Sequence, residues 1–129
     1  RLEVLAEETE LAEIRLPCPG EVQLPGLRVT CGPAGEFLNT PDAFTVSPVG
    51  QIRIRARKSG DRICLSAGSK SLKKLFIDRK IPAALRNRIP VVCDDAGVLG
   101  VYTIGANWDR TAGETAVTIR FENTENKGE

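Results

Sequence analysis

The residues best able to do chemistry in this sequence are the lysines and arginines gathered in the middle of the chain. Residues 51–90 contain twelve basic and only two acidic residues, although the formal net charge of the whole chain is only +1. Such a block is typical of proteins that bind a polyanion, because release of counterions from a phosphate backbone supplies most nonspecific nucleic-acid affinity. The basic block (residues 51–90) therefore predicts a nucleic-acid partner, with a solvated basic face as the alternative.

Self-sufficient catalysis is not expected. The chain contains no histidine, which removes Ser-His-Asp and Cys-His nucleophile systems and the usual general base near neutral pH. The adjacent carboxylates Asp94 and Asp95 precede Ala96-Gly97, a pattern that indicates a hairpin turn rather than an acid–base pair. The segment Gly68–Ser71 resembles the end of a P-loop but lacks the glycine required directly before the lysine. We expect no catalytic residue, no metal site and no cofactor in this chain.

The four cysteines are Cys18, Cys31, Cys64 and Cys93. No two of them have the short spacing of a zinc or redox motif. Cys64 and Cys93 stand in moderately apolar contexts that are typical of buried thiols in a cytosolic protein. We expect four free thiols, with a disulfide as the open alternative.

Location and completeness can also be read from the sequence. No apolar run approaches the roughly 18 residues of a membrane helix, and the acidic N-terminal stretch is unlike a signal peptide. The chain begins at Arg1 and contains no methionine. These features predict a cytoplasmic protein without membrane contact, present here as a fragment or a processed chain.

Short strands separated by proline and glycine fill residues 1–50, which predicts a β-rich sandwich or barrel. The clearest strand is Gln51–Arg57, where Ile52, Ile54 and Ala56 share one face. Arg53, Arg55 and Arg57 then share the opposite face, which we expect to be exposed. Strands are also expected over residues 91–94, 98–104 and 116–121.

Two short helices are expected within the basic block. Leu72, Leu75 and Phe76 form an apolar stripe at helical spacing, which predicts a helix over residues 71–79 that ends before Pro82. A second short helix is expected over residues 83–88, before Pro90. The fold class is therefore α+β: a β-rich sandwich-like or barrel-like domain with two short helices. The aromatic residues are expected mostly in the core.

The junction before the first helix should attract an anion. A small-residue loop over residues 66–70 leads into a helix start that carries Lys70, Lys73 and Lys74, where the helix dipole favours acidic side chains. Lys74 also occupies the position at which a capping box has Glu or Gln. A phosphate would interact favourably with the free backbone N–H groups, the dipole and the ammonium groups. We therefore expect a phosphate contact at this junction.

Three motifs in order resemble the C-terminal domain of tRNA(Ile)-lysidine synthase. They are R-x-R-x-x-G-D-R at residues 55–62, K-S-L-K-K-L-F at residues 70–76 and I-P-x-x-x-R-x-R-I-P-V at residues 81–91. The similarity covers roughly residues 52–105, and Gly105 matches a glycine near its end. Residues 106–110 match less well.

The resemblance implies a parent enzyme that uses ATP to adenylate the wobble cytidine of an isoleucine tRNA with a CAU anticodon and then ligates lysine to it. The S-G-G-x-D-S loop of the ATP site is absent from this sequence. ATP with magnesium is therefore expected only in an N-terminal catalytic domain of the same polypeptide. The resemblance also implies that this C-terminal domain contacts the tRNA body toward the acceptor stem.

The basic block and the resemblance together give the candidate RNA-binding residues. These are Arg53, Arg55, Arg57, Lys58, Arg62, Lys70, Ser71, Lys73, Lys74, Arg86 and Arg88. We expect a β-rich part over residues 1–50, a basic β-α-α-β docking domain over residues 51–122 and a disordered tail over residues 123–129. The alternative function is an assembly module, either a homodimer interface or a contact between domains, whose basic surface is incidental.

Overall fold

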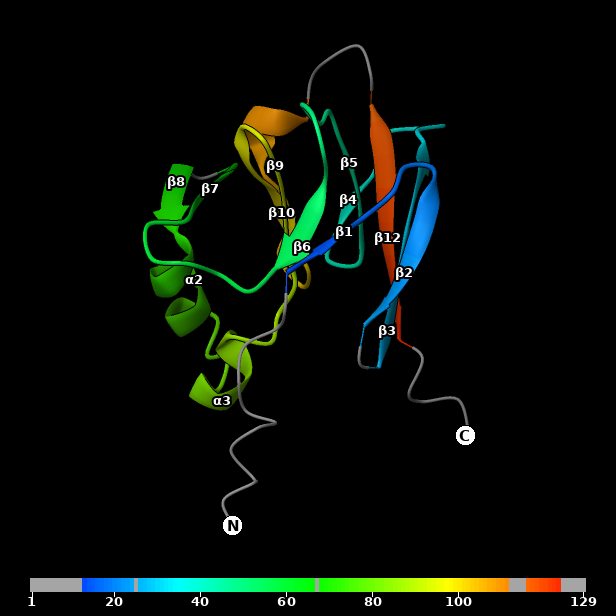
Figure 1. Cartoon of the computed structure of the whole chain (residues 1–129). Coiled ribbons are helices and arrows are strands. Elements are labelled where there is room, and N and C mark those ends of the chain that lie inside the picture. The colour runs from blue at the N-terminus through cyan, green and yellow to red at the C-terminus, as the bar shows by residue number, and fades with distance from the viewer. Residues whose placement is uncertain (1–12, 25, 67, 112–115, 124–129) are drawn as a thin grey trace.

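The computed structural model describes residues 13–24, 26–66, 68–111 and 116–123, which form two antiparallel sheets, a hairpin and two short helices (Figure 1). The first sheet has the order β1-β6-β9-β10-β11. Its strands are β1 (Ile14–Arg15), β6 (Arg53–Arg55), β9 (Val91–Asp94), β10 (Gly97–Val101) and β11 (Gly105–Ala106). The turn predicted at Asp94–Gly97 is present and joins β9 to β10.

The second sheet has the order β2-β3-β12-β5-β4. Its strands are β2 (Gly20–Leu24), β3 (Leu27–Pro33), β4 (Asn39–Thr40), β5 (Ala43–Val46) and β12 (Val117–Asn123). The long strand β12 pairs with β3 on one side and with β5 on the other. A separate hairpin is formed by β7 (Arg62–Leu65) and β8 (Gly68–Ser71).

The helical elements are α2 (Leu72–Asp78), α3 (Ala83–Arg86) and the 3₁₀ turn η1 (Trp108–Arg110). The two helices lie on the outer side of the first sheet in Figure 1, opposite the second sheet. The predicted α+β class with two short helices is confirmed. The predicted loop over residues 66–70 is wrong in part, because β8 adds paired strand structure to a Gly- and Ser-rich segment of low intrinsic β propensity.

Two apolar clusters hold these layers together. The larger cluster lies between the sheets and joins buried residues of both, including Val29, Phe44 and Ile119 from one sheet and Ile54 and Leu99 from the other. The smaller cluster lies on the other side of the first sheet, where Leu72, Leu75 and Phe76 of α2 pack with valines of β9 and β10. The apolar stripe predicted for the first helix is thus the face that fixes α2 to the sheet.

The segments before and after residue 50 share this architecture. β1 pairs with β6, and β12 lies between β3 and β5, so residues of both segments contribute to one core. The change at residue 50 is a change of charge along the chain and not a break in the packing. Asn123 ends β12, whereas residues 124–129 of the predicted tail and strand residues predicted before residue 13 lie outside the described residues.

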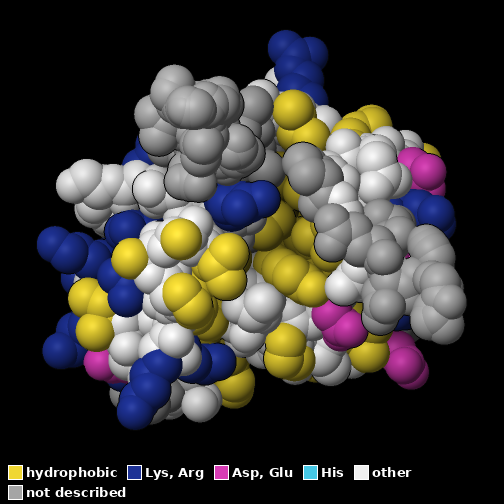
Figure 2. All heavy atoms as spheres, turned by 90° about the horizontal axis from the view of Figure 1, so that it is seen from below, with side chains coloured by type: hydrophobic (Ala, Val, Ile, Leu, Met, Phe, Trp, Pro, Cys, Tyr) yellow, Lys and Arg dark blue, Asp and Glu magenta, His cyan; other side chains and the backbone are white. Residues whose placement is uncertain are grey.

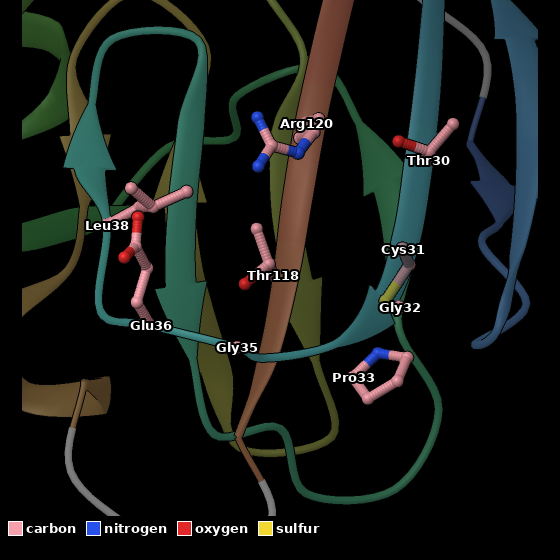
Figure 3. A pocket seen from close by; sticks show the side chains of 9 residues that line it. All are labelled: Thr30, Cys31, Gly32, Pro33, Gly35, Glu36, Leu38, Thr118 and Arg120. Atoms are coloured by element: carbon pink, nitrogen blue, oxygen red, sulfur yellow. The ribbon is translucent and has the colours of Figure 1, made fainter.

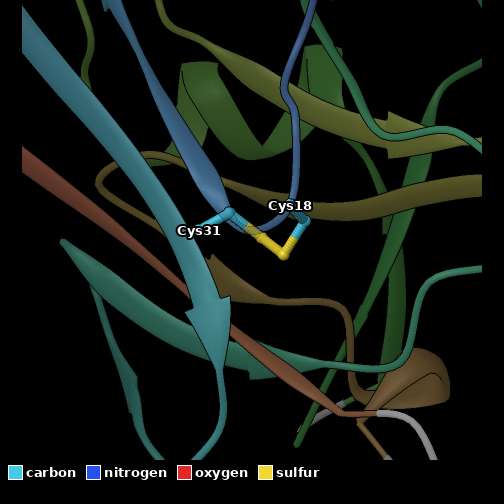
Figure 4. Close-up of a disulfide and its surroundings, with 2 residues drawn as sticks. All are labelled: Cys18 and Cys31. Atoms are coloured by element: carbon cyan, nitrogen blue, oxygen red, sulfur yellow. A yellow bond between two sulfur atoms is a disulfide. The ribbon is translucent and has the colours of Figure 1, made fainter.

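The expectation of four free thiols is wrong for one pair. Cys18 and Cys31 form a disulfide with a Cα–Cα distance of 5.2 Å, which ties the segment before β2 to β3 (Figure 4). Cys64 and Cys93 are free, the first partly buried and the second buried. Spacing along the sequence gave no sign of the disulfide, because the register of β2 on β3, which places Gly20 opposite Cys31, brings the two cysteines together.

The backbone conformation at residue 105 explains why a glycine stands there. Its φ of +119° is a conformation that L side chains rarely adopt, and an added Cβ would lie 2.7 Å from Oδ1 of Asn39. That oxygen accepts a hydrogen bond from the backbone N–H of Ala106 at 2.9 Å. The glycine therefore allows the turn after β10 to close against β4.

Candidate nucleic-acid interface

The strongest concentration of unneutralised charge lies on the two helices and the turns that follow them. Six basic residues of this segment form no ion pair with any other described residue, and five of them are exposed and the sixth half-buried. We call them the helix-pair surface: Lys73, Lys74, Arg79, Lys80, Arg86 and Arg88. Viewed from below, most Lys and Arg side chains lie on the left, the side on which Figure 1 places α2 and α3 (Figure 2).

The sequence of α2 explains why its cations face solvent. Leu72, Leu75 and Phe76 are buried, so the helix is rotated with Lys73 and Lys74 outward. The Ser71 side chain accepts a hydrogen bond from the Lys74 N–H at 3.1 Å and so acts as the N-cap. The first turn contains no acidic residue, and the positive end of the helix dipole adds to the local positive potential.

Lys70 and Arg62 differ from this exposed group. The Nζ atom of Lys70 lies 3.1 Å from Oδ2 of Asp78, so much of its charge is neutralised locally. Arg62 is exposed, and its Nε donates a hydrogen bond to Oγ of Ser69 at 3.3 Å across the β7–β8 hairpin. At the junction predicted to hold a phosphate, Lys73 and Lys74 are thus the cations without an ion pair to another described residue.

Arg53, Arg55 and Arg57, in and just after β6, form the arginine row. Two of the three form ion pairs with carboxylates of the protein. Ile52, Ile54 and Ala56 are buried as predicted. Arg53, however, contacts Glu13 and Asp95 at 3.5 and 3.2 Å. Lys58, which follows the row, lies 3.9 Å from Glu13.

Arg57 occupies a different environment, against α2. Its guanidinium carbon lies 5.8 Å from the centroid of the Phe76 ring, a cation–π arrangement. Its Nε atom is buried and has no hydrogen-bond partner among the described residues. Arg57 is thus the member of the row whose charge is not matched by a carboxylate of the described residues.

Arg55 forms an ion pair with Asp61, called here the Arg55–Asp61 clip, which fixes the turn before the helix-pair surface. Its two terminal nitrogens donate to the carboxylate of Asp61 at 2.8 and 3.1 Å, and the Arg55 side chain is only 12% exposed. Burial alone would lower the pKa of Arg55, but the hydrogen bond to Asp61 raises it above its ordinary value. We therefore assign Arg55 a positioning role, since its donors are turned toward the protein.

Asp61 also accepts hydrogen bonds from backbone N–H groups of the segments before and after it. Its Oδ2 accepts from the Lys58 N–H at 2.7 Å, and its carbonyl oxygen accepts from the Leu72 N–H at 2.9 Å. Gly60, at φ +91°, allows the turn between them. The G-D-R part of the motif thus connects β6 to the first residue of α2.

Breaking the clip should destabilise the protein. We expect Asp61→Asn to lower the free energy of unfolding by about 2–4 kcal/mol, because it leaves the Arg55 charge largely buried and uncompensated. The measurement is urea unfolding at pH 7 of Asp61→Asn, Arg55→Gln and the double variant. The double variant should lose less stability than the two single losses added together. Strict additivity would show that the two side chains do not act as a pair.

Two cations of the helix-pair surface, Arg79 and Lys80, were not among the residues predicted from sequence. They directly follow the last turn of α2, and their own exposure in the structure shows that they belong to the surface. The signal available in the sequence was their place in the basic block. Arg86 and Arg88 were predicted, and Nε of Arg86 donates to the Ile81 carbonyl at 2.8 Å.

The aromatic residues divide between the core and the surface. Phe44, Phe76 and Phe121 are buried as expected, whereas Phe37 and Trp108 are 61% and 51% exposed. Trp108 belongs to η1, which Asn107 caps by accepting from the Asp109 N–H at 3.2 Å. Asn107 also accepts from the Cys64 N–H at 3.1 Å and so joins η1 to the β7–β8 hairpin.

A groove of about 320 Å³ lies elsewhere, on the outer face of the second sheet (Figure 3). Arg120 and Thr118 of β12 and Thr30 of β3 line it, with Glu36 on the loop that borders it. None of the candidate RNA-binding residues contributes to this groove. In the part of the chain that the structure describes, no cluster of His, Cys, Asp and Glu could hold a metal ion, and no helix is long and apolar enough to cross a membrane.

These features define an α+β domain of two antiparallel sheets with a cationic pair of short helices on one side. Residues 52–123 match the family described as the TilS substrate C-terminal domain, and the chain belongs to this family. The resemblance noted in the three motifs is thereby confirmed.

Individual relatives agree with the family assignment. The chain is 44% identical to the tRNA(Ile)-lysidine synthase of Clostridioides difficile over 73 residues, which are 54% of this chain and 16% of that protein. It is 36% identical to the tRNA(Ile)-lysidine synthase of Geobacillus kaustophilus over 91 residues, or 64% of this chain and 20% of that protein. The chain thus spans a fifth or less of the length of these curated relatives.

The fold has been seen before. A crystal structure described as the TilS C-terminal domain matches with a TM-score of 0.74 at 27% identity. The match covers 90% of this chain and 98% of the solved one. The similarity therefore extends beyond the motif region to include most of the strands before residue 52.

Proposed function

We propose that this chain is the tRNA-binding C-terminal domain of a tRNA(Ile)-lysidine synthase. It holds the tRNA body toward the acceptor stem while an ATP- and magnesium-dependent catalytic domain of the same polypeptide ligates lysine to the wobble cytidine. The observation that carries the proposal is the helix-pair surface, six cations without a carboxylate partner among the described residues. The names of the relatives and the small share of their length that this chain covers support it.

The physical basis is phosphate neutralisation. Arginine and lysine contacts to phosphates position a nucleic acid without reading its sequence, and double-stranded RNA is recognised mostly through its shape and backbone. If four to six of these cations each neutralise one phosphate, the logarithm of the binding constant should fall with the logarithm of salt concentration with a slope of roughly −3 to −5. Such a slope separates phosphate binding from contacts that are mainly apolar.

The proposed interface differs from the set expected from sequence. Its centre is α2 and α3 rather than the β6 row, because Arg53, Arg55 and Lys58 already contact carboxylates. Arg57 and Arg62 flank the helix-pair surface and extend it toward the β7–β8 hairpin. Ser71 acts through the cap that it provides for α2.

A second candidate function is protein assembly, which two exposed side chains favour. Ile77 of α2 and Leu85 of α3 are 49% and 45% exposed within the same helix pair. Apolar side chains at the centre of a patch with a polar rim are typical of protein interfaces. A homodimer or a contact between domains through this face would give a concentration-dependent mass without RNA, insensitive to charge reversal.

The proposed function is tested by binding of the chain to unmodified isoleucine tRNA and to a DNA duplex of the same length across a salt titration. We expect preferential tRNA binding with a steep salt slope. Sedimentation of the free chain in parallel tests assembly. If tRNA does not bind even at low salt while the chain self-associates, the assembly function replaces the proposed one.

A further inference from the structure

Lys80 adopts a backbone conformation that ordinarily favours glycine. Its φ is +59°, in the left-handed region, directly after the C-cap residue Arg79 of α2. The Lys80 N–H donates to the Ile77 carbonyl at 2.9 Å, and the Ile81 N–H donates to the Phe76 carbonyl at 3.0 Å. These two bonds define a Schellman motif, whose left-handed position is usually glycine because a Cβ is disfavoured there.

The folded protein gains little that would offset this strain. Lys80 is exposed and forms no ion pair with another described residue. A cation near a helix C-terminus does interact favourably with the dipole, but Arg79 already provides one at the neighbouring position. The backbone bonds and the packing of Ile81 against the smaller apolar cluster would all remain with glycine at residue 80. Stability therefore does not account for the lysine.

The position of Lys80 suggests a different reason. It lies in the turn between α2 and α3, with Lys73 and Lys74 before it and Arg86 and Arg88 after it. Strained backbone is often retained at functional sites, where the side chain rather than the fold benefits. We propose that Lys80 contacts a phosphate of the bound tRNA and that lysine is kept at this left-handed position for that contact. The inference rests on the proposed function.

The test uses two glycine substitutions with matched backbone effects. Thr103, at φ +74°, is also an exposed left-handed residue, but it lies in the turn between β10 and β11, outside the helix-pair surface. Lys80→Gly and Thr103→Gly should both raise the melting temperature, by about 2–4 °C each, as the strain is relieved. Only Lys80→Gly should weaken binding to isoleucine tRNA, roughly 3- to 10-fold at 0.1 M salt, and reduce the salt slope by about one.

A third variant separates charge from conformation. Lys80→Met keeps a side chain at the left-handed position, so it should weaken tRNA binding as Lys80→Gly does without the gain in melting temperature. Wild-type affinity and salt slope for Lys80→Gly would overturn the inference about Lys80, while binding by the unaltered chain would leave the proposed function standing. If the unaltered chain does not bind tRNA, both are wrong.

Discussion

Changing Lys73 and Lys74 together to glutamate should weaken tRNA binding at least about 100-fold at 0.1 M salt, because two attractive phosphate contacts become repulsive. The same change should not destabilise the fold. Acidic side chains in the first turn of α2 interact favourably with the helix dipole, and Glu at position 74 would complete a capping box with Ser71. We therefore expect the variant to bind tRNA more weakly, as measured by fluorescence anisotropy. Its melting temperature should equal or exceed that of the unaltered chain.

The matched control places the same change of net charge elsewhere. Arg15 and Arg120 are exposed and lie on β1 and β12, outside the helix pair. The variant with Arg15→Glu and Arg120→Glu should lose much less affinity, since long-range effects between exposed charges are screened beyond about 10 Å at 0.1 M salt. Equal losses in the two double variants would mean that total charge, and not the helix-pair surface, governs binding.

Replacing Asp94 by asparagine should lower the free energy of unfolding by about 3–5 kcal/mol at pH 7, because a mostly buried Arg110 charge would lose its partner. The Asp94 side chain is fully buried and forms an ion pair with Arg110. Its oxygens also accept from the N–H groups of Val49, Ala96 and Gly97 at 2.6, 2.8 and 3.0 Å. The carboxylate thereby joins the loop after β5, the β9–β10 hairpin and η1. Urea unfolding of Asp94→Asn and of the unaltered chain would measure the loss of stability.

The loss should also depend on pH in a defined direction. Burial alone would raise the pKa of Asp94, but the hydrogen bonds from Arg110 and from backbone N–H groups lower it below its ordinary value. A lowered pKa in the folded state contributes stability that is present above the unfolded carboxyl pKa of about 3.9 and is lost as the pH falls through the folded value. The difference in stability between the unaltered chain and Asp94→Asn should therefore shrink below about pH 4. A difference of constant size from pH 7 to pH 3 would contradict the ionised pair.

Local sequence patterns were sufficient for β6 and α2 in the basic block, although they missed the strand β8. The alternation over residues 51–57 and the stripe of Leu72, Leu75 and Phe76 are short-range periodicities, and burial in the structure follows both. The second helix begins directly after Pro82, as predicted, but it ends at Arg86 and so is shorter than the predicted range of residues 83–88. The three motifs also gave the family, because they preserve the order and spacing of specific residues.

Pairings between distant residues could not be predicted in this way. The pattern of β12 shows that it is a strand but not that it lies between β3 and β5. The Cys18–Cys31 disulfide and the left-handed backbone of Lys80 likewise depend on the folded arrangement.

The same limit applies to the site. Alternation placed Arg53, Arg55 and Arg57 on one face, but it could not show that Asp95 and Asp61 would engage two of them. The charge of the block was readable from sequence, whereas the availability of each cation was not. Ion pairs and burial therefore moved the centre of the proposed interface to α2 and α3.

The most direct test of tRNA binding through the helix-pair surface is a map of amide chemical-shift changes in the ¹⁵N-labelled chain as isoleucine tRNA is added. We expect salt-sensitive changes concentrated over residues 72–88, with smaller changes at the β7–β8 hairpin. The outer face of the second sheet, including Thr30 and Arg120, should remain unchanged. Changes confined to that outer face, or none at low salt, would contradict tRNA binding through α2 and α3.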